Sequence, residues 1–204
     1  MCGRYDFSKP NQNEFQGVDW NGFEGQKEIW PTNPVPVLLF DENNGYQMCT
    51  KHWGFIKYWP GKTGRIIAHN LINAKSEEIT FKRNFKKAYE SARCIIPMNG
   101  WYEWPVNDEG TKTKTWIGIK DRPLFGAAGI YETETDKDTG KTIEVFSMLT
   151  VAPGMNTPLK QAHDRAPLLL ERDNYMTWLT GSEGDRQSLI QPIEDQDAFI
   201  FKPV

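Results

Sequence analysis

The stretch RCIIPMNGWYEWP (residues 93–105) is the part of the sequence that decides the fold class. It places two runs of isoleucine, tryptophan and tyrosine, which favour β-strands, on either side of a proline and a glycine that interrupt regular structure. We therefore predict a strand over 93–105 that is broken by a turn at Pro97–Gly100. Three later segments have the same strand-forming character, and they are 115–120, 124–132 and 142–152.

A β-hairpin is predicted upstream of this stretch. Two prolines bracket an apolar run in PTNPVPVLLF (31–40), which predicts a turn followed by a strand. The polar sequence DENNG (41–45) has the composition of a hairpin turn, and 46–55 is expected to be the returning strand. The segment WPGKTG (59–64) is predicted to be a loop.

The clearest helical pattern lies in TFKRNFKKAYESA (80–92), where apolar residues recur at the spacing of one helix face. Ser76 or Thr80 is the candidate N-cap of this helix. A second short helix is predicted over 172–181, whereas prolines and a glycine make 153–167 irregular. The apolar face of the first helix consists of Phe81, Phe85, Ala88 and Tyr89, and the opposite, basic face consists of Lys82, Arg83, Lys86 and Lys87.

Length and composition indicate one globular domain. The chain has 204 residues, which is enough to bury a full hydrophobic core. Its content of 38% apolar and 13% aromatic residues is ordinary for a globular protein. We see no repeats and no linker. The sequence therefore predicts an α+β fold in a single domain over 1–204 that strands dominate.

Several classes of protein are excluded by what the sequence lacks. There is no secretory signal in residues 1–20 and no apolar run of about 20 residues for a membrane span. Cys2, Cys49 and Cys94 are odd in number and lack metal-ligand spacing, so we expect neither a disulfide framework nor a metal site. No P-loop, GxGxxG, GxSxG or HExxH motif is present. We expect a cytoplasmic protein without a cofactor.

Charge is distributed unevenly along the chain. The whole sequence carries a net charge of −3, yet residues 57–93 hold nine basic and three acidic residues, a balance of +6. Such a segment in a mildly acidic protein predicts a local anion-binding face. A solvated helix face would give the same pattern, so both interpretations stand at this point.

Four short stretches concentrate polar groups, and the first is MCGR (1–4). Behind the initiator methionine, Cys2 would carry a thiol and an α-amine on neighbouring atoms once Met1 is removed, a pair that no internal residue offers. The alternative is an incidental small residue at a frayed end. In NGWYEW (99–104), Glu103 lies among aromatic residues whose packing would raise its pKa and suit it to general acid–base catalysis. It could equally be a strand glutamate that faces water.

The other two stretches are INAKSE (72–77) and AHDRAP (162–167). Asn73 could hold an amine or a phosphate oxygen and Lys75 could contact a phosphate, or the segment could be a turn with a helix cap. His163 lies in a segment rich in proline and glycine, where an imidazole could shuttle protons near neutral pH. A surface histidine without a function is the alternative.

Taken together, these motifs resemble one protein family. In chain order, MCGRY (1–5), NAKSE (73–77), CIIPMNGWYEW (94–104) and AHDRAP (162–167) resemble the SRAP family, the SOS-response-associated peptidases that also act as sensors of abasic sites in single-stranded DNA. The resemblance runs from residue 1 to about 180 and includes PTNPVPV, HWGFI and GAAGIYE. It implies a barrel-like fold of twisted antiparallel strands with a few flanking helices.

The resemblance also implies a chemistry for the N-terminus. In this family Met1 is removed, the amine of the new N-terminal cysteine condenses with the ring-opened aldehyde of an abasic sugar, and the thiol closes onto the imine to give a thiazolidine. An α-amine suits this role because its pKa is about 7.7–8.0, against about 10.4 for lysine, so more of it is unprotonated at neutral pH. Closure of a five-membered ring by the adjacent thiol gains from proximity.

By the same resemblance, each matching residue receives a role. Cys2 is the nucleophile, and Asn73 positions the new terminus. Glu103 assists proton transfer during methionine removal and imine formation, and His163 handles the sugar hydroxyl and its ring opening. Arg4 meets a phosphate or supports the pocket.

The sequence departs from the family pattern in three places. Lys75 stands where the family usually has an arginine, which keeps the charge but loses the planar fork for bidentate phosphate contact. Asn99 replaces an acidic residue, and Ala162 and Ala166 replace bulkier apolar residues. These changes concern DNA affinity and pocket shape more than the chemistry.

Binding of single-stranded DNA is expected along the basic segment. Lys75, Lys82 and Lys86 would follow the phosphate backbone together with Lys57, Lys62 and Arg65, and tryptophans such as Trp53, Trp59 or Trp101 would stack on bases. Two other functions are kept as alternatives. One is a thiol-dependent peptidase that acts on other proteins, and the other is a non-covalent binding module for single-stranded or modified DNA. A monomer is expected, without a membrane partner.

Overall fold

The centre of the molecule is a closed ring of five strands. β12 pairs with β4, β4 with β3, β3 with β8, β8 with β11, and β11 again with β12. All of these pairs are antiparallel except that of β12 with β4. The computed structural model describes residues 2–10, 14–107, 109–135, 140–155, 157–191 and 197–204. The ring strands are β3 (Pro34–Asp41), β4 (Gly45–Trp53), β8 (Arg93–Met98), β11 (Phe125–Thr135) and β12 (Thr142–Val151).

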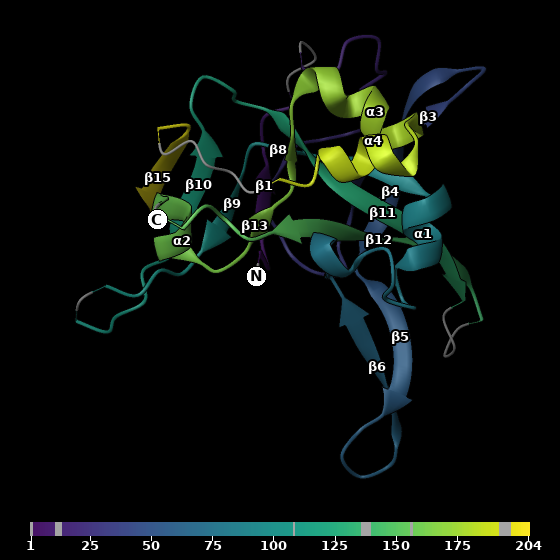
Figure 1. Cartoon of the computed structure of the whole chain (residues 1–204), viewed down its shortest axis with the longest axis horizontal. Helices are drawn as coiled ribbons and strands as arrows, with labels where there is room; N and C mark the ends of the chain where they lie inside the picture. The colour runs from purple at the N-terminus through teal and green to yellow at the C-terminus, as the bar shows by residue number, and fades with distance from the viewer. Residues whose placement is uncertain (1, 11–13, 108, 136–139, 156, 192–196) are drawn as a thin grey trace.

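A second sheet of five strands, in the order β15-β10-β9-β1-β2, lies beside the ring (Figure 1). The chain enters it directly from β8, with only Asn99 between the two strands. The Asn99 side chain holds this junction, because it accepts from the Lys9 amide at 2.9 Å and donates to the Lys9 carbonyl at 3.0 Å. The strands are β1 (Tyr5–Phe7), β2 (Gln26–Ile29), β9 (Gly100–Glu103), β10 (Thr115–Ile119) and β15 (Phe199–Pro203).

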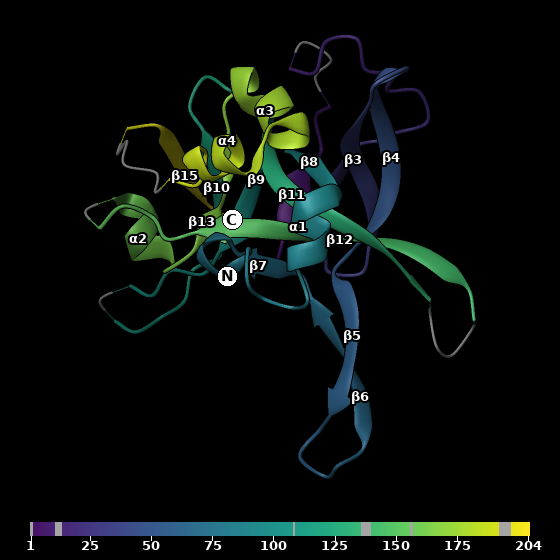
Figure 2. The ribbon, with the colours of Figure 1, turned by 45° about the vertical axis from the view of Figure 1, so that its right-hand side comes forward.

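A hairpin of β5 (Phe55–Pro60) and β6 (Ile66–Leu71) projects from the body of the molecule (Figure 1). Figure 2 shows this projection again, with α3 and α4 on the opposite side of the ring. The remaining strands are β7 (Asn73–Lys75), β13 (Ala166–Pro167) and β14 (Leu169–Leu170). The helices are α1 (Lys86–Ser91), α2 (Pro158–Ala162), α3 (Tyr175–Thr180) and α4 (Glu183–Ser188), with 3-10 turns η1 (Ser76–Glu78) and η2 (Arg172–Asn174).

The predicted strand-dominated α+β fold and its barrel-like core are confirmed. The hairpin of β3 and β4 forms as expected, with Asp41 opposite Gly45 at its turn. The predicted turn at Pro97–Gly100 is too wide, because Pro97 lies within β8 and the break is at Asn99 alone. The expected loop over 59–64 is also partly wrong, since β5 continues to Pro60 and the link runs from 61 to 65.

The helix predicted over 80–92 forms only in its second half. Helix α1 begins at Lys86, and Phe85 at its N-cap offers no side-chain cap. Phe85 packs against Phe55 at 5.8 Å between ring centroids, and Tyr89 is buried, but Phe81 is 65% exposed. Apolar spacing alone therefore overextends this helix, because no core surface covers its first turn.

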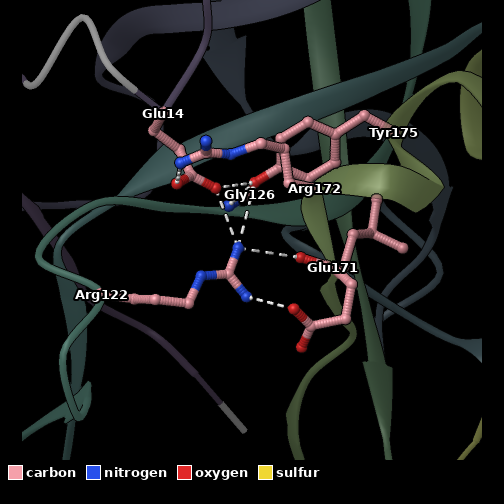
Figure 3. Close-up of polar contacts among 7 residues, drawn as sticks. Glu14, Arg122, Gly126, Glu171, Arg172 and Tyr175 are labelled. Atoms are coloured by element: carbon pink, nitrogen blue, oxygen red, sulfur yellow. Dashed lines mark hydrogen bonds and ion pairs between the residues drawn. The ribbon is translucent and has the colours of Figure 1, made fainter.

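A buried carboxylate joins the N-terminal segment to α3, as Figure 3 shows. Glu14 accepts hydrogen bonds from Tyr175 Oη at 2.7 Å, Arg122 Nη2 at 2.8 Å and Arg172 Nη2 at 2.7 Å. Tyr175 Oη accepts in turn from the Gly126 amide of β11 at 2.8 Å. Burial raises the pKa of Glu14, but the bonds from Arg172, Tyr175 and Arg122 outweigh it and lower the pKa below its usual value.

Glu14→Gln is expected to lower the free energy of unfolding by about 3 kcal/mol at pH 7, because it leaves two arginines and a tyrosine without their shared charge. A depressed folded-state pKa gives stability that is complete above the unfolded value of 4.5 and is lost as the pH falls through the lower folded value. Urea unfolding at pH 7 and in acid checks both effects. The exposed Glu24→Gln is the matched control, and equal unfolding curves for the two variants would contradict the prediction.

Candidate active site

The described start of the chain, from Cys2 to Tyr5, contacts both sheets. Asn73 Nδ2 of β7 donates to the Cys2 carbonyl at 2.7 Å. On the other side, Tyr102 N donates to the Arg4 carbonyl at 2.9 Å, and Tyr5 stands opposite Trp101 in the pairing of β1 with β9. This antiparallel register carries the start of the chain alongside Glu103. Cys2, Asn73 and Glu103 therefore come together from three separate parts of the sequence, as the motifs predict.

The Cys2 thiol is enclosed. The residue is fully buried, and its Sγ donates to the Arg4 carbonyl at 3.5 Å. Burial raises the pKa of this thiol well above its usual value, and the nearby charge of Glu103 raises it further. The sulfur is therefore a neutral thiol at neutral pH, and it is not a resting thiolate nucleophile.

Glu103 has the electrostatics of a proton-transfer group. Its side chain comes from β9 and is 3% exposed. Burial raises its pKa from 4.5 to about 7, so both protonation states are populated at neutral pH. The expectation that its aromatic surroundings would shift this group toward neutrality is confirmed, and the alternative of a water-facing strand glutamate is wrong.

Two buried oxygen acceptors at this site lack a partner. Asn73 Oδ1 and Glu103 Oε1 are both shielded from solvent, and neither accepts a hydrogen bond from the residues that the structure describes. Buried acceptors without donors are costly and rare in folded proteins. An added group that donates hydrogen bonds would satisfy them.

His163 follows α2 at its C-cap, on the segment that leads into β13. Its Nδ1 accepts from the Arg165 amide at 3.0 Å, so the neutral ring carries its proton on Nε2. Burial lowers the pKa of the imidazole, and the positive charge at the start of the chain contributes in the same direction. The ring is therefore neutral at pH 7 and responds to the charge of the N-terminus.

Arg165 fixes this segment, a role that the sequence reasoning missed. Its guanidinium forms a bidentate pair with Glu77 at 2.6 and 2.8 Å. It also donates to the Thr150 carbonyl of β12. Because Thr150 stands opposite both Lys75 of β7 and Pro167 of β13, the contact holds the His163 segment close to the Asn73 segment. The presence of Arg165 in the same AHDRAP stretch is the only sequence signal for it.

The Arg4 guanidinium is engaged by contacts within the protein. It pairs with Glu28 at 2.7 Å, and its guanidinium carbon lies 3.4 Å from the centroid of Trp30 and 4.9 Å from that of Trp104. Lys114 shares Glu28 at 2.8 Å. Because Glu28 and Trp30 already engage the guanidinium, the structure does not favour the expected phosphate contact of Arg4, and support of the pocket stays a prediction.

Two of the tryptophans proposed as base-stacking residues are core residues instead. Trp53 is fully buried, stacks on Phe146 and donates through Nε1 to the Ile72 carbonyl at 2.9 Å. Trp101 is also fully buried and packs edge-on against Phe125 at 6.5 Å between centroids. Neither ring offers a face to a base, so this part of the prediction is wrong.

The basic segment divides into committed and available cations. Lys57 pairs with Glu132 and Glu134 and is neutralised. Lys82 and Lys86 form exposed pairs of 3.3 Å with Glu78 and 3.8 Å with Glu90, a class of pair that contributes little and leaves the cations accessible. The exposed cations of this segment that form no ion pair with a described residue are Lys62, Arg65, Lys75, Arg83 and Lys87, and the first three lie in the link between β5 and β6 or on β7.

The described ranges contain neither a candidate metal site nor a helix that could cross a membrane. No group of three or more histidine, cysteine, aspartate or glutamate side chains there is arranged to hold a metal ion. None of the helices found in that part of the chain has the length and apolar character that crossing a membrane requires.

Comparison with known proteins agrees with the geometry. The abasic site processing protein YoaM of Bacillus subtilis is 30% identical over 210 residues, which cover 99% of this chain and 90% of the relative. The abasic site processing protein YedK of Escherichia coli is 28% identical over 193 residues, covering 88% and 79%. A crystal structure of a Bacteroides thetaiotaomicron protein has the same fold, with a TM-score of 0.79 and 22% identity over 100% of this chain and 92% of that one. The family model for SOS response associated peptidase (SRAP) matches residues 1–204, and the chain belongs to this family.

Proposed function

We propose that this protein processes abasic sites in single-stranded DNA by forming a covalent thiazolidine between the sugar and Cys2, after Met1 has been removed. The abasic site processing proteins similar to it support the target. The observation that carries the chemistry is a pair of buried acceptors, Asn73 Oδ1 and Glu103 Oε1, which lie near the Cys2 backbone and have no hydrogen-bond partner among the described residues.

Release of Met1 would turn the Cys2 amide nitrogen into an α-amine. An ammonium group there has three N–H donors. Asn73 Oδ1 and Glu103 Oε1 are acceptors at the same site. The new terminus would be oriented by Asn73, which already holds the Cys2 carbonyl. Such orientation places the amine for attack without a further ordering step.

The reaction then proceeds in two steps, imine formation and ring closure. The unprotonated amine adds to the sugar aldehyde, and the resulting hydroxyl leaves as water when Glu103 supplies a proton, which gives the imine. The Cys2 sulfur then adds to the imine carbon while its proton passes to the imine nitrogen, and the five-membered ring closes. A carboxyl whose pKa is raised toward 7 by burial can both give and recover the proton.

Ring opening of the sugar needs a separate proton carrier. An abasic sugar is mostly a closed hemiacetal, and its aldehyde appears only when the ring oxygen gains a proton and the hydroxyl loses one. His163 is neutral at pH 7, with its proton on Nε2. We assign this transfer to His163 and its positioning to Arg165, which acts through the backbone of the segment.

The buried thiol argues against general proteolysis. A thiol peptidase that cleaves other proteins needs an accessible thiolate, but Cys2 is fully buried and its pKa is raised by burial. In the thiazolidine reaction the amine attacks first, and the thiol needs to react only within the ring that is being formed. The site can therefore form the crosslink without cleaving a protein substrate.

The DNA strand would pass from Lys75 to the projecting hairpin. Asn73 and Lys75 lie two residues apart on β7 and so share a face, which places a cation beside the reacting terminus. On the hairpin, Trp59 stacks on His69 at 3.7 Å between centroids, and Ile66 is 55% exposed. Apolar surface next to Lys62 and Arg65 suits unstacked bases and their phosphates.

Intact mass spectrometry with an abasic oligonucleotide tests the linkage. We expect wild-type protein that begins at Cys2 to form an adduct equal to protein plus DNA minus one water, stable without a reductant. Cys2→Ser keeps the amine but closes no thiazolidine, so its adduct should persist only after borohydride reduction. A stable adduct of Cys2→Ser without borohydride would contradict the thiazolidine, and cleavage of a supplied peptide by wild type would support the peptidase alternative.

Glu103→Gln should slow crosslinking by about 10²-fold, because it removes the proton donor to the leaving hydroxyl. In wild type that begins at Cys2, the neutral acid is lost as the pH rises through the pKa of Glu103 in that form, so the rate should fall on that limb. The glutamine variant should lack this limb. Rates of adduct formation against pH measure both effects, with the exposed Glu90→Gln as control. Equal pH profiles for wild type and Glu103→Gln would remove Glu103 from the mechanism.

DNA binding should depend on salt through the available cations. Three phosphate contacts from Lys62, Arg65 and Lys75 predict a log–log slope of about −2, at about −0.7 for each contact with single strands. Replacing both Lys62 and Arg65 with alanine should reduce the slope to about −0.7. Fluorescence anisotropy at several salt concentrations measures it. Alanine at the exposed Lys112 and Lys120 removes the same charge elsewhere, and an equal loss of slope in that control would contradict the assigned path.

A further inference from the structure

A cavity of about 590 Å³ lies on the face of the five-stranded sheet that points away from Glu103. Successive side chains of a strand alternate between its two faces. Tyr102 lines the cavity, and it lies between Trp101 and Glu103 on β9, both of which face the opposite side. The sheet therefore separates the cavity from the site formed by Cys2, Asn73 and Glu103.

The floor of this cavity is an indole ring that lies flat on the sheet. A Cβ atom at Gly100 of β9 would be 2.5 Å from Cε2 of Trp116, and one at Gly118 of β10 would be 2.3 Å from Cη2. Both distances are shorter than real Cβ contacts, so glycine is required at both positions for the ring to lie there. The two glycines thus leave room on β9 and β10 for the Trp116 ring, which we call the aromatic platform. Trp116 itself is only half-buried.

Hydrogen-bonding groups fix the platform and border it. Trp116 Nε1 donates to Asp6 Oδ2 at 3.0 Å, which sets the direction of the ring. Beside it, the Tyr102 hydroxyl is buried and has no partner among the described residues. Burial, followed by the charges of Asp6 and Glu28, raises the pKa of Tyr102 to about 12, so the hydroxyl stays protonated and can donate. An uncommitted buried donor next to a stacking surface indicates a planar ligand that carries acceptors.

The rim of the cavity is basic. Lys9, Lys27 and Lys202 line it, all three are exposed, and none forms an ion pair with a residue in the described ranges. Lys202 Nζ stands 5.1 Å from the Trp116 ring centroid, above the platform. The acidic groups in the lining are Asp6, which is bonded to the indole, and the exposed Asp121. The uncommitted lysines favour an anion over a neutral sugar.

We propose that this cavity is a second binding site that takes a nucleotide, with the base stacked on Trp116, a base acceptor on the Tyr102 hydroxyl and the phosphate at the lysines of the rim. Its ligand is either a free mononucleotide or a nucleotide within a single strand that passes over this face. The site uses none of the residues assigned to the Cys2 reaction. The test of this site is therefore independent of the test of the proposed function.

Titration by NMR, with the Trp116 indole N–H as the reporter, tests the site. Adenosine monophosphate should shift this resonance in a saturable way, and adenosine should do so more weakly. Inorganic phosphate alone should shift it least. A short oligodeoxyadenosine without an abasic site forms the second arm. A shift by the oligonucleotide at lower concentration than by the mononucleotide assigns the site to the DNA strand, and the reverse order assigns it to a free nucleotide.

Two variants separate the base from the phosphate. Trp116→Leu should weaken binding of adenosine monophosphate by about tenfold or more, as measured by calorimetry, because stacking is lost. The double variant Lys27→Glu, Lys202→Glu should weaken adenosine monophosphate by a similar factor while leaving adenosine unchanged. Lys87→Glu with Lys112→Glu is the matched charge control. Both test variants should still crosslink an abasic oligonucleotide at the wild-type rate.

The proposal is overturned if neither the mononucleotide nor the oligonucleotide shifts the Trp116 indole at millimolar concentration. It is equally overturned if the lysine double variant binds adenosine monophosphate as well as the charge control does. Because the lysine variant changes only exposed side chains, this second outcome does not depend on whether Trp116→Leu folds.

Discussion

The hydrogen bond from Asn73 to the Cys2 carbonyl is the interaction on which the site depends. It joins the two sheets, because Asn73 belongs to β7, which pairs with β12 of the ring, whereas Cys2 leads into β1 of the other sheet. A chain terminus is ordinarily poorly ordered unless it is tied down. Here β1 is paired on both sides, with β2 and with β9, and Asn73 holds the residue that precedes it. Cys2 is therefore held in a defined position.

The pKa values of the candidate site residues are set by burial more than by ion pairs. Exclusion of water raises the pKa of the Cys2 thiol and of the Glu103 carboxyl, and it lowers that of the His163 imidazole. All three groups are thus biased toward their neutral forms, which can exchange protons without carrying a large fixed charge. By contrast, two arginines near this site are committed to partners, Arg4 to Glu28 and Arg165 to Glu77. These ion pairs stabilise the segments around the site, and the neutral groups are the ones available for proton transfer.

Local sequence signals predicted the parts of the fold that depend on local physics. The β3–β4 hairpin follows from its turn residues, and α3 follows from a short apolar repeat. The closure of the ring through β11 and β12, and the long-range pairing of β15 with β10, arise from contacts that no window of sequence contains. For the same reason Trp53 and Trp101 were assigned to the surface although both are core residues. The candidate site residues Cys2, Asn73, Glu103 and His163 stand out as polar groups in apolar or turn-rich stretches and receive their roles through the resemblance, whereas the role of Arg165 requires the structure.

The central claim is that the freed α-amine of Cys2 becomes the partner of Glu103. The most direct test is a ¹³C NMR titration of the Glu103 carboxyl in two forms of the protein, one that keeps Met1 and one that begins at Cys2. With Met1 in place the pKa should lie near 7, because burial raises it and the charge of the Met1 amine lowers it by less. After Met1 is removed, an ammonium group beside the carboxylate should lower that pKa clearly. An identical pKa in both forms would show that the amine lies elsewhere, and would contradict the account.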